Sequence, residues 1–199
     1  MKTLKLFALL LFFALLGFNN RLAAQVDVTI NPVILLAADV GLGADFVVSE
    51  NISIEAKLGY GSTKLSSPFS NLFGEEDDSF DPTLKAFSIN AVGKYYFNPK
   101  RGADGFYADL FLRNVNRTYD STPQSGNADV RWNRTSIGFG AGYKVVAAKG
   151  LVFDIGLGLG RSIIGDPTYV GEGNQQSVNW PNTMLQGKLG IGYRFGGGE

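Results

Sequence analysis

The 199-residue chain contains no cysteine and no histidine. Without cysteine there is no disulfide framework and no zinc–thiolate site. Without histidine the chain lacks the commonest general base and the commonest metal ligand. We therefore expect a protein that is not an enzyme, with no catalytic residues, no metal site and no cofactor.

Long hydrophobic runs are also missing, apart from one at the N-terminus. There Lys2 and Lys5 precede an apolar core, Leu6 to Leu16, which the small-residue sequence LAAQ follows. This order is typical of a cleavable secretory signal peptide. The apolar stretch is shorter than the ~20 residues that a spanning helix needs, which disfavours an uncleaved anchor. We predict a signal peptide over 1–24 and a single mature domain over 25–199.

An excess of positive charge is likewise absent. The full chain has 18 basic and 18 acidic residues. Removal of residues 1–24 takes away three basic residues and no acid, so the mature charge is 15 − 18 = −3. No basic excess is left to suggest a nucleic-acid partner.

What the chain does contain is alternation of apolar with small or polar residues. In ISIEAKLGYG (52–61) the apolar residues occupy every second position, whereas a helix would bring Glu55 and Leu58 onto one face. Most such segments are near the ~9–11 residues of a tilted membrane strand and longer than the ~5–6 of globular strands. Eight segments are predicted as strands: 26–36, 40–48, 52–61, 85–97, 105–116, 132–146, 151–162 and 185–195.

The two faces of these strands differ in composition. One face carries no charge away from its ends, and it includes Val28, Ile34, Leu42, Phe46, Ile89, Tyr95, Leu110, Ile137, Phe139, Tyr143, Phe153, Leu157, Leu189 and Tyr193. The other face holds Asp27, Asp45, Glu55, Lys57, Lys94, Asp109, Arg113, Lys144, Asp154, Lys188 and Arg194. It also holds glycines: Gly41, Gly43, Gly59, Gly138, Gly140, Gly142, Gly156, Gly158, Gly160, Gly190 and Gly192.

Glycine on the charged face decides between two architectures. A soluble β-sandwich would bury the apolar face and expose the charged one, but glycine weakens exposed strands and offers nothing to pack. A narrow barrel lumen needs small residues so that a few long side chains fit. Strands in lipid must also close, because an open edge leaves backbone groups unpaired. We predict an all-β fold, an eight-stranded antiparallel up-and-down transmembrane β-barrel.

The connections alternate in length. Those at 49–51, 98–105 and 147–150 are short, and those at 62–84, 117–131 and 163–184 are long and polar. Outer-membrane barrels have short periplasmic turns and long extracellular loops, so the first connection should be the tight turn AAD (37–39). Pro32 cannot donate a ladder hydrogen bond, which predicts a bulge or a break in strand 26–36.

The last strand, GKLGIGYRF, carries a resemblance. Lys188, Gly190 and the alternating aromatics Tyr193 and Phe195 resemble the C-terminal signal of Gram-negative outer-membrane proteins, although the chain continues to Glu199. The mature chain resembles small eight-stranded outer-membrane barrels of the OmpA-barrel and OmpX kind and the uncharacterised barrels grouped with them. This resemblance implies outer-membrane localisation and recognition of the last strand by the barrel-assembly machinery.

Aromatic residues should form a belt at the periplasmic rim, since their rings favour the membrane interface. The predicted belt joins Tyr193 and Phe195 with Phe46, Tyr95, Phe97, Phe106, Tyr143 and Phe153.

Other motifs have more ordinary interpretations. GFGAGY (138–143) and GLGLGR (156–161) keep a strict period of two with no following helix, so they are lumen glycines and not a nucleotide loop. The acidic loop GEEDDSFD (74–81) lacks the ligand spacing of a calcium loop. Asp109 and Glu55 would be the candidates for a catalytic carboxylate pair, but nothing in the sequence places them together.

Three functions stay open at this point. The first is a structural or interaction barrel that presents its extracellular loops, or docks on a larger outer-membrane complex, with its lumen charges paired into a plug. The second is a narrow porin-like channel for small solutes. The third is a soluble exported binding module. The expected surroundings of the first are outer-membrane lipid and the barrel-assembly machinery.

Overall fold

The computed structural model describes residues 25–32, 39–64, 83–120, 129–165, 168–171, 174–177 and 182–196. The predicted signal peptide, the acidic loop 74–81 and Ile34 lie outside the described residues. Within the described residues, no helix is long and apolar enough to cross a membrane.

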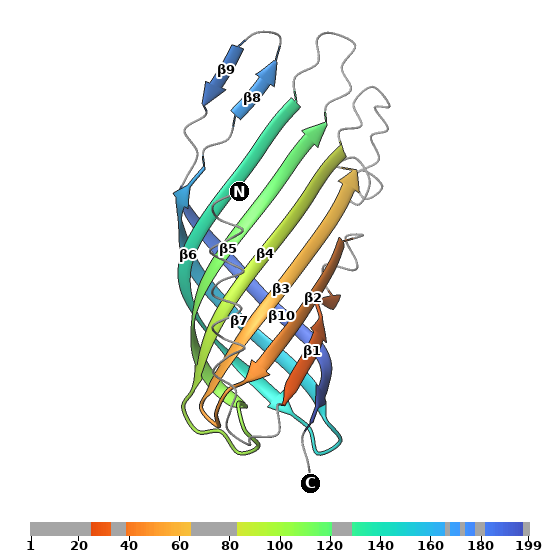
Figure 1. The fold of residues 1–199 in the computed structure, drawn as a ribbon, viewed down its shortest axis with the longest axis vertical. Coiled ribbons are helices and arrows are strands. Elements are labelled where there is room, and N and C mark those ends of the chain that lie inside the picture. Colours follow the sequence, from red (N-terminus) through yellow and green to blue (C-terminus); the bar gives the residue numbers. More distant parts are fainter. Residues whose placement is uncertain are drawn as a thin grey trace, which may run out of the picture.

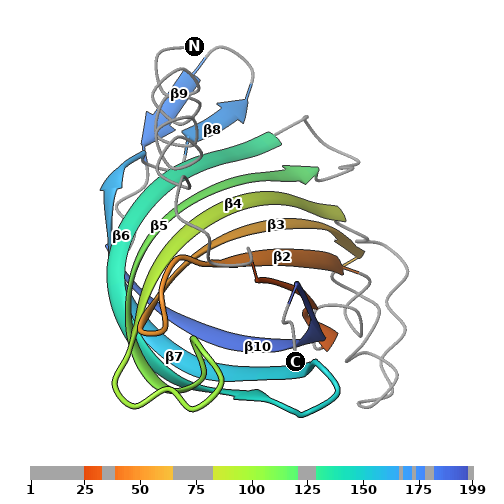
Figure 2. The ribbon, with the colours of Figure 1, turned by 60° about the horizontal axis from the view of Figure 1, so that its bottom comes forward.

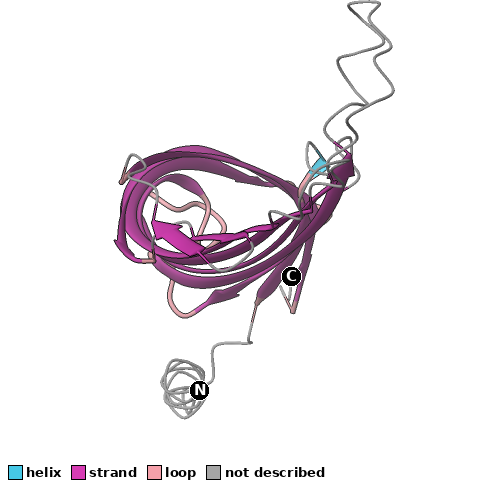
Figure 3. Ribbon diagram, turned by 90° about the horizontal axis from the view of Figure 1, so that it is seen from above, coloured by secondary structure: helices cyan, strands magenta, loops and turns pink. Residues whose placement is uncertain are grey.

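Eight strands close into a barrel (Figures 1 and 3). Each strand pairs antiparallel with its neighbours, and β1 pairs with β10 to complete the ring. The strands of the ring are β1 (Val26–Ile30), β2 (Asp39–Val47), β3 (Ile52–Lys64), β4 (Thr83–Tyr96), β5 (Gly105–Asp120), β6 (Asp129–Val146), β7 (Leu151–Ile164) and β10 (Thr183–Phe195). The predicted eight-stranded up-and-down barrel is confirmed.

The structure corrects the predicted end of the first strand and the predicted end of the turn that follows it. β1 ends at Ile30 and not at residue 36, so the break expected near Pro32 is found. The tight turn over 37–39 is wrong at its end, because Asp39 already pairs with Gly61 as the first residue of β2. Proline cannot donate to a ladder, which explains why pairing stops just before it.

The predicted loop 163–184 is also corrected, since part of it is ordered sheet. It contains two short strands, β8 (Thr168–Gly171) and β9 (Asn174–Ser177), which form a hairpin. β8 pairs with Asp129 to Arg131 at the start of β6, so the hairpin prolongs the sheet outside the ring (Figure 2). Polar strands such as NQQS lack the alternation that a sequence search for strands uses.

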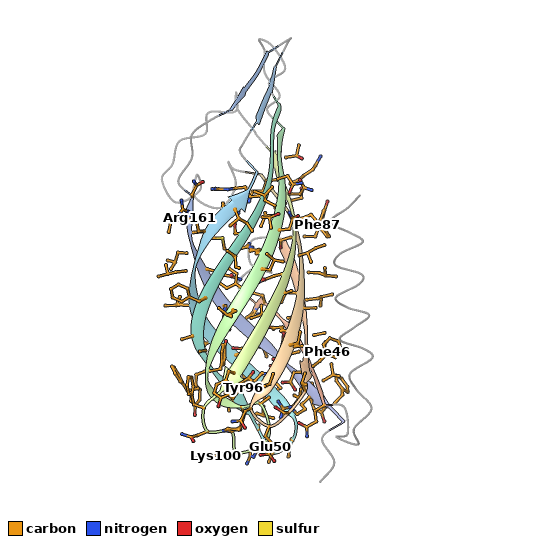
Figure 4. The ribbon with its side chains drawn as sticks, turned by 60° about the vertical axis from the view of Figure 1, so that its left-hand side comes forward. Phe46, Glu50, Phe87, Tyr96, Lys100 and Arg161 are labelled. Atoms are coloured by element: carbon orange, nitrogen blue, oxygen red, sulfur yellow. The ribbon has the colours of Figure 1, made fainter. Side chains whose placement is uncertain are left out.

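The barrel is apolar outside and polar inside. Leu110, Phe139, Leu157 and Leu185 are each more than 60% exposed, whereas Asp27, Glu55, Lys94 and Lys144 are at most 2% exposed. Figure 4 shows Phe46 and Phe87 on the outer surface and Tyr96 within the barrel. A soluble protein would not expose this apolar belt while burying ions, so the structure excludes the β-sandwich and fits a barrel in lipid.

The ring has two different ends. The short-turn end carries the turns between β2 and β3, β4 and β5, and β6 and β7, together with both ends of the ring's chain (Figure 1). The opposite, long-loop end carries the β8–β9 hairpin. Most of the predicted rim aromatics are exposed near the short-turn end, where Phe97 stacks on Phe106 at 5.5 Å and Tyr193 meets Phe195 edge-on at 5.1 Å.

Candidate functional site in the barrel lumen

The lumen near the short-turn end is filled by a connected network of ion pairs. Lys94 on β4 lies at its centre, with its Nζ 3.1 Å from Asp45, 3.0 Å from Glu55 and 2.6 Å from Asp154. These three carboxylates come from β2, β3 and β7, so one ammonium group joins strands from both sides of the ring. An ion buried this deeply needs such partners, because its desolvation costs several kcal/mol.

A second cation extends the network to the first strand. Lys144 on β6 lies 2.6 Å from both Asp27 and Asp45. Asp27 in turn accepts two hydrogen bonds from Arg194 on β10, from Nε at 2.6 Å and from Nη2 at 2.9 Å. Two parallel hydrogen bonds between a guanidinium group and a carboxylate fix the relative orientation of the two side chains and strengthen their ion pair.

Two further pairs lie beyond this cluster. Lys57 contacts Glu55 at 3.0 Å, and Lys188 forms a short ion pair with Asp109. The pairing predicted for the lumen charges therefore holds for five of the six predicted cations: Lys57, Lys94, Lys144, Lys188 and Arg194. The prediction is wrong for Arg113, which has no carboxylate partner among the described residues.

Aromatic side chains share the lumen with these ions. The Tyr107 hydroxyl donates to Asp154 at 2.6 Å, and Lys94 lies 5.0 Å from the Tyr107 ring centroid. Lys144 lies 5.4 Å from the Tyr96 ring, and Lys188 5.4 Å from the Phe111 ring. A desolvated cation over an aromatic ring is a favourable contact. The sequence interpretation missed these three rings, although strict alternation places them on the faces of Lys94 and Asp109.

The glycines of β6 and β7 make room for these rings. A Cβ atom on Gly158 would lie 2.9 Å from Phe111, and one on Gly156 would lie 3.0 Å from the Tyr107 hydroxyl. Both distances are tighter than ordinary carbon contacts. The prediction that these are lumen glycines which leave space for large side chains is therefore confirmed.

The turn between β4 and β5 folds under the short-turn end and closes it. Arg194 donates to the carbonyl oxygens of Arg101 at 2.8 Å and Ala103 at 3.3 Å. Ala103 is fully buried against Tyr96 and Tyr107 and has a φ of 45°. Its amide donates to the backbone carbonyl oxygen of Glu50 at 2.7 Å. Asp104 stabilises the turn by accepting from the amides of Lys100 and Arg101.

The carboxylates that could have formed a catalytic pair are each engaged by a cation. Asp109 binds Lys188, and Glu55 binds Lys57 and Lys94. Among the described residues there is no group of three or more Asp or Glu side chains that could hold a metal ion. Asp45 lies directly opposite both Asp27 and Glu55 in the ladders, and Lys94 and Lys144 lie between these carboxylates as their shared partners.

The long-loop half of the lumen contains a cavity of about 170 Å³. Its polar lining includes Lys57 and Asn90 from β3 and β4, Arg113 from β5, and Gln186 and Lys188 from β10. The side-chain oxygens of Asn90 and Gln186 are buried and have no hydrogen-bond partner among the described residues. Alternation indicates Lys57, Arg113 and Lys188 as lumen residues, but it cannot show that a cavity lies between them.

Comparison with known proteins agrees with this architecture. A major outer membrane protein from Thermus thermophilus has a similar structure, with a TM-score of 0.52 and 13% identity over 87% of this chain and 100% of that one. The attachment invasion locus protein Ail of Yersinia pestis is less similar, with a TM-score of 0.47 and 14% identity over 87% of this chain and 100% of Ail. No curated protein matches the sequence.

These similarities concern the fold alone, since the identities are low. The family is shown by the sequence itself, through a family model that matches residues 7–193, nearly the whole chain. The eight-stranded barrel with its charged lumen therefore belongs to the family described as "Protein of unknown function (DUF3575)".

Proposed function

We propose that this protein is a non-catalytic barrel of the outer membrane, with a plugged lumen and an interacting long-loop end. The observation that carries the proposal is the buried network around Lys94, which spans the lumen from β2 to β7 just above a turn that closes the short-turn end. A lumen filled in this way serves as a scaffold and not as a passage.

Outer-membrane localisation is supported by the exterior. Leu110, Phe139 and Leu157 face outward on strands long enough to cross a bilayer. The five residues of β1 pair with both β2 and β10, so backbone pairing closes the ring near the short-turn end. The aromatic pairs at the short-turn end fit the periplasmic interface, which supports an orientation with the long-loop end outside the cell.

The last strand supports assembly by the barrel-assembly machinery. Tyr193 and Phe195 are both exposed on β10, the strand that pairs with β1 to close the ring. Their rings are therefore accessible from outside the barrel. Alanine at both positions should lower the amount of heat-modifiable barrel in the membrane more than alanine at Phe87, an exposed aromatic residue on β4.

An interaction role is supported by the length of the sheet. β5 has 16 residues and β6 has 18, beyond the ~9–11 that cross a membrane. The β8–β9 hairpin continues this sheet outside the ring, and β9 pairs only with β8 among the described strands. A projecting sheet with a free edge is a ready surface for a protein partner.

The interaction role is tested in the native membrane. A photo-reactive residue at Gln176 on β9 should crosslink the chain to a partner in intact cells. The same residue at Lys149, on a short turn, is the matched control and should give a different pattern. Identical patterns from both positions would contradict an interacting long-loop end.

The narrow channel is the second candidate, favoured by the cavity of about 170 Å³ in the long-loop half. Planar-bilayer recording separates the two. The plugged barrel should insert without steady conductance at moderate voltage. Reproducible channel steps from the purified protein would overturn the plug and establish the channel.

A further inference from the structure

The cavity in the long-loop half of the lumen has a lining that the scaffold role does not use. Three cations line its walls, together with two amides whose side-chain oxygens have no hydrogen-bond partner among the described residues. Five of the six predicted lumen cations have carboxylate partners. Arg113 is the predicted lumen cation that has none among the described residues.

The lining has a regular layout. Lys57, Asn90 and Arg113 are directly paired across β3, β4 and β5, so they form one row on one wall. Gln186 and Lys188 alternate on β10, which is four strands away from β4 in either direction around the ring. The row and the pair therefore lie on opposite walls.

The buried amides indicate which chemical groups the cavity could bind. Asn90 is 5% exposed and Gln186 is 8% exposed, and the side-chain oxygen of each has no partner among the described residues. A buried acceptor without a donor is destabilising, because it has lost its hydrogen bonds to water. A group with hydroxyl donors that occupied the cavity would satisfy both amides.

We propose that this cavity binds a small hydroxylated anion, with its phosphate or carboxylate against Arg113 and its hydroxyl groups at Asn90 and Gln186. Arg113 offers the planar donors that recognise both oxyanions, while Lys57 and Lys188 in the same lining already pair with Glu55 and Asp109. The cavity is several times the roughly 30 Å³ of one water molecule, and a cavity of roughly 150 Å³ accommodates benzene, so the ligand is the size of a three- to six-carbon compound.

The same chemistry could come from a free metabolite or from a lipid headgroup. The cavity is lined by Gly41 and Leu42 of β2 and by Leu185 and Gly187 of β10, on either side of the place where β1 ends. A headgroup at this seam would present the same phosphate and hydroxyl groups as a free glycerol phosphate.

Titration calorimetry of the full chain in a maltoside detergent tests the site. Glycerol 3-phosphate and glycerate serve as hydroxylated anions, inorganic phosphate as the anion alone, and glycerol as the neutral probe. We expect at least one hydroxylated anion to bind, more tightly than inorganic phosphate, with no heat from glycerol. Binding of neither hydroxylated anion would overturn the proposal without touching the plug, which conductance tests separately.

Variants assign the binding to this cavity. Arg113→Gln should weaken the better anion at least about tenfold. The control Arg161→Gln, an exposed cation on β7, should bind as the wild type does. Equal affinity in Arg113→Gln and the wild type would overturn the site. In Gln186→Met the preference over inorganic phosphate should disappear, and its persistence would overturn the role of the amides. Unchanged heat-modifiable migration verifies that each variant is folded.

Nanodiscs distinguish the two sources. If a lipid headgroup is the ligand, glycerol 3-phosphate should bind at least about tenfold more weakly in phosphatidylglycerol discs than in phosphatidylcholine discs. If a free metabolite is the ligand, the two affinities should agree.

Discussion

Arg194 on the last strand holds Asp27 on the first through two parallel hydrogen bonds, from Nε at 2.6 Å and from Nη2 at 2.9 Å. These residues are directly opposite each other in the β1–β10 ladder, which is the seam that closes the barrel. The same guanidinium group holds the turn at 101–103 under the lumen. One side chain thus joins the first strand, the last strand and the turn at the short-turn end.

Loss of this side chain should open the seam. Arg194→Gln should lower the free energy of unfolding by about 3–5 kcal/mol, because the buried Asp27 keeps only Lys144 as an ionic partner. Urea unfolding in vesicles, followed by gel migration without heating, measures the change. Lys149→Gln, on an exposed turn, is the control, and an equal effect of the two would contradict a role for the seam.

The opposite environments of Leu157 and Gly158 test the direction of the barrel faces. Leu157 is 64% exposed, while Gly158 is buried. Leu157→Arg should cost ~2–4 kcal/mol at the bilayer midplane, and Gly158→Ala ~1–3 kcal/mol through crowding against Phe111.

Because the two expected losses of stability overlap, the reactivity of a thiol at position 157 is a better test of the barrel faces than the size of either loss. Because the chain has no cysteine, the variant Leu157→Cys carries a single thiol. It should react with lipid-soluble reagents and resist charged ones. Free access of charged reagents to position 157 would show that the apolar face is not in lipid.

Space for the lumen aromatics depends on particular glycines. A Cβ on Gly142 would collide with Tyr107, whereas one on Gly187 would meet nothing within 4 Å. Gly142→Ala should therefore lower stability by about 1–3 kcal/mol, and Gly187→Ala should leave it unchanged or slightly raised. Equal unfolding midpoints for the two variants would refute the explanation by space.

The hydroxyl of Tyr107 can be tested alone. Tyr107→Phe removes its hydrogen bond to Asp154 but leaves the ring over Lys94. A hydrogen bond to a charged group contributes about 1.5–3 kcal/mol, so the unfolding free energy should fall by that amount. Tyr143→Phe, on the exposed face, should have no comparable effect. An unchanged unfolding free energy in Tyr107→Phe would mean that Asp154 needs only its ion pair with Lys94.

The amino-acid sequence by itself determined the architecture. Alternation is a local property, so the faces of β3, β7 and β10 could be read directly, and Pro32 marked the end of β1. The absence of charge on one face and the glycines on the other established which side meets lipid. Strands joined by short turns are neighbours in the sheet, so their pairing followed from their order in the sequence.

Only the tertiary structure decided the partners inside the lumen. Alternation shows that Lys94, Lys144 and Arg113 point inward, but their height and angle around the axis depend on the stagger of the closed sheet. That stagger brings Lys94 to three carboxylates and leaves Arg113 beside a cavity with none among the described residues. The tertiary structure also showed that β8 and β9 form a hairpin on β6, because their pairing depends on a neighbouring strand and not on their own composition.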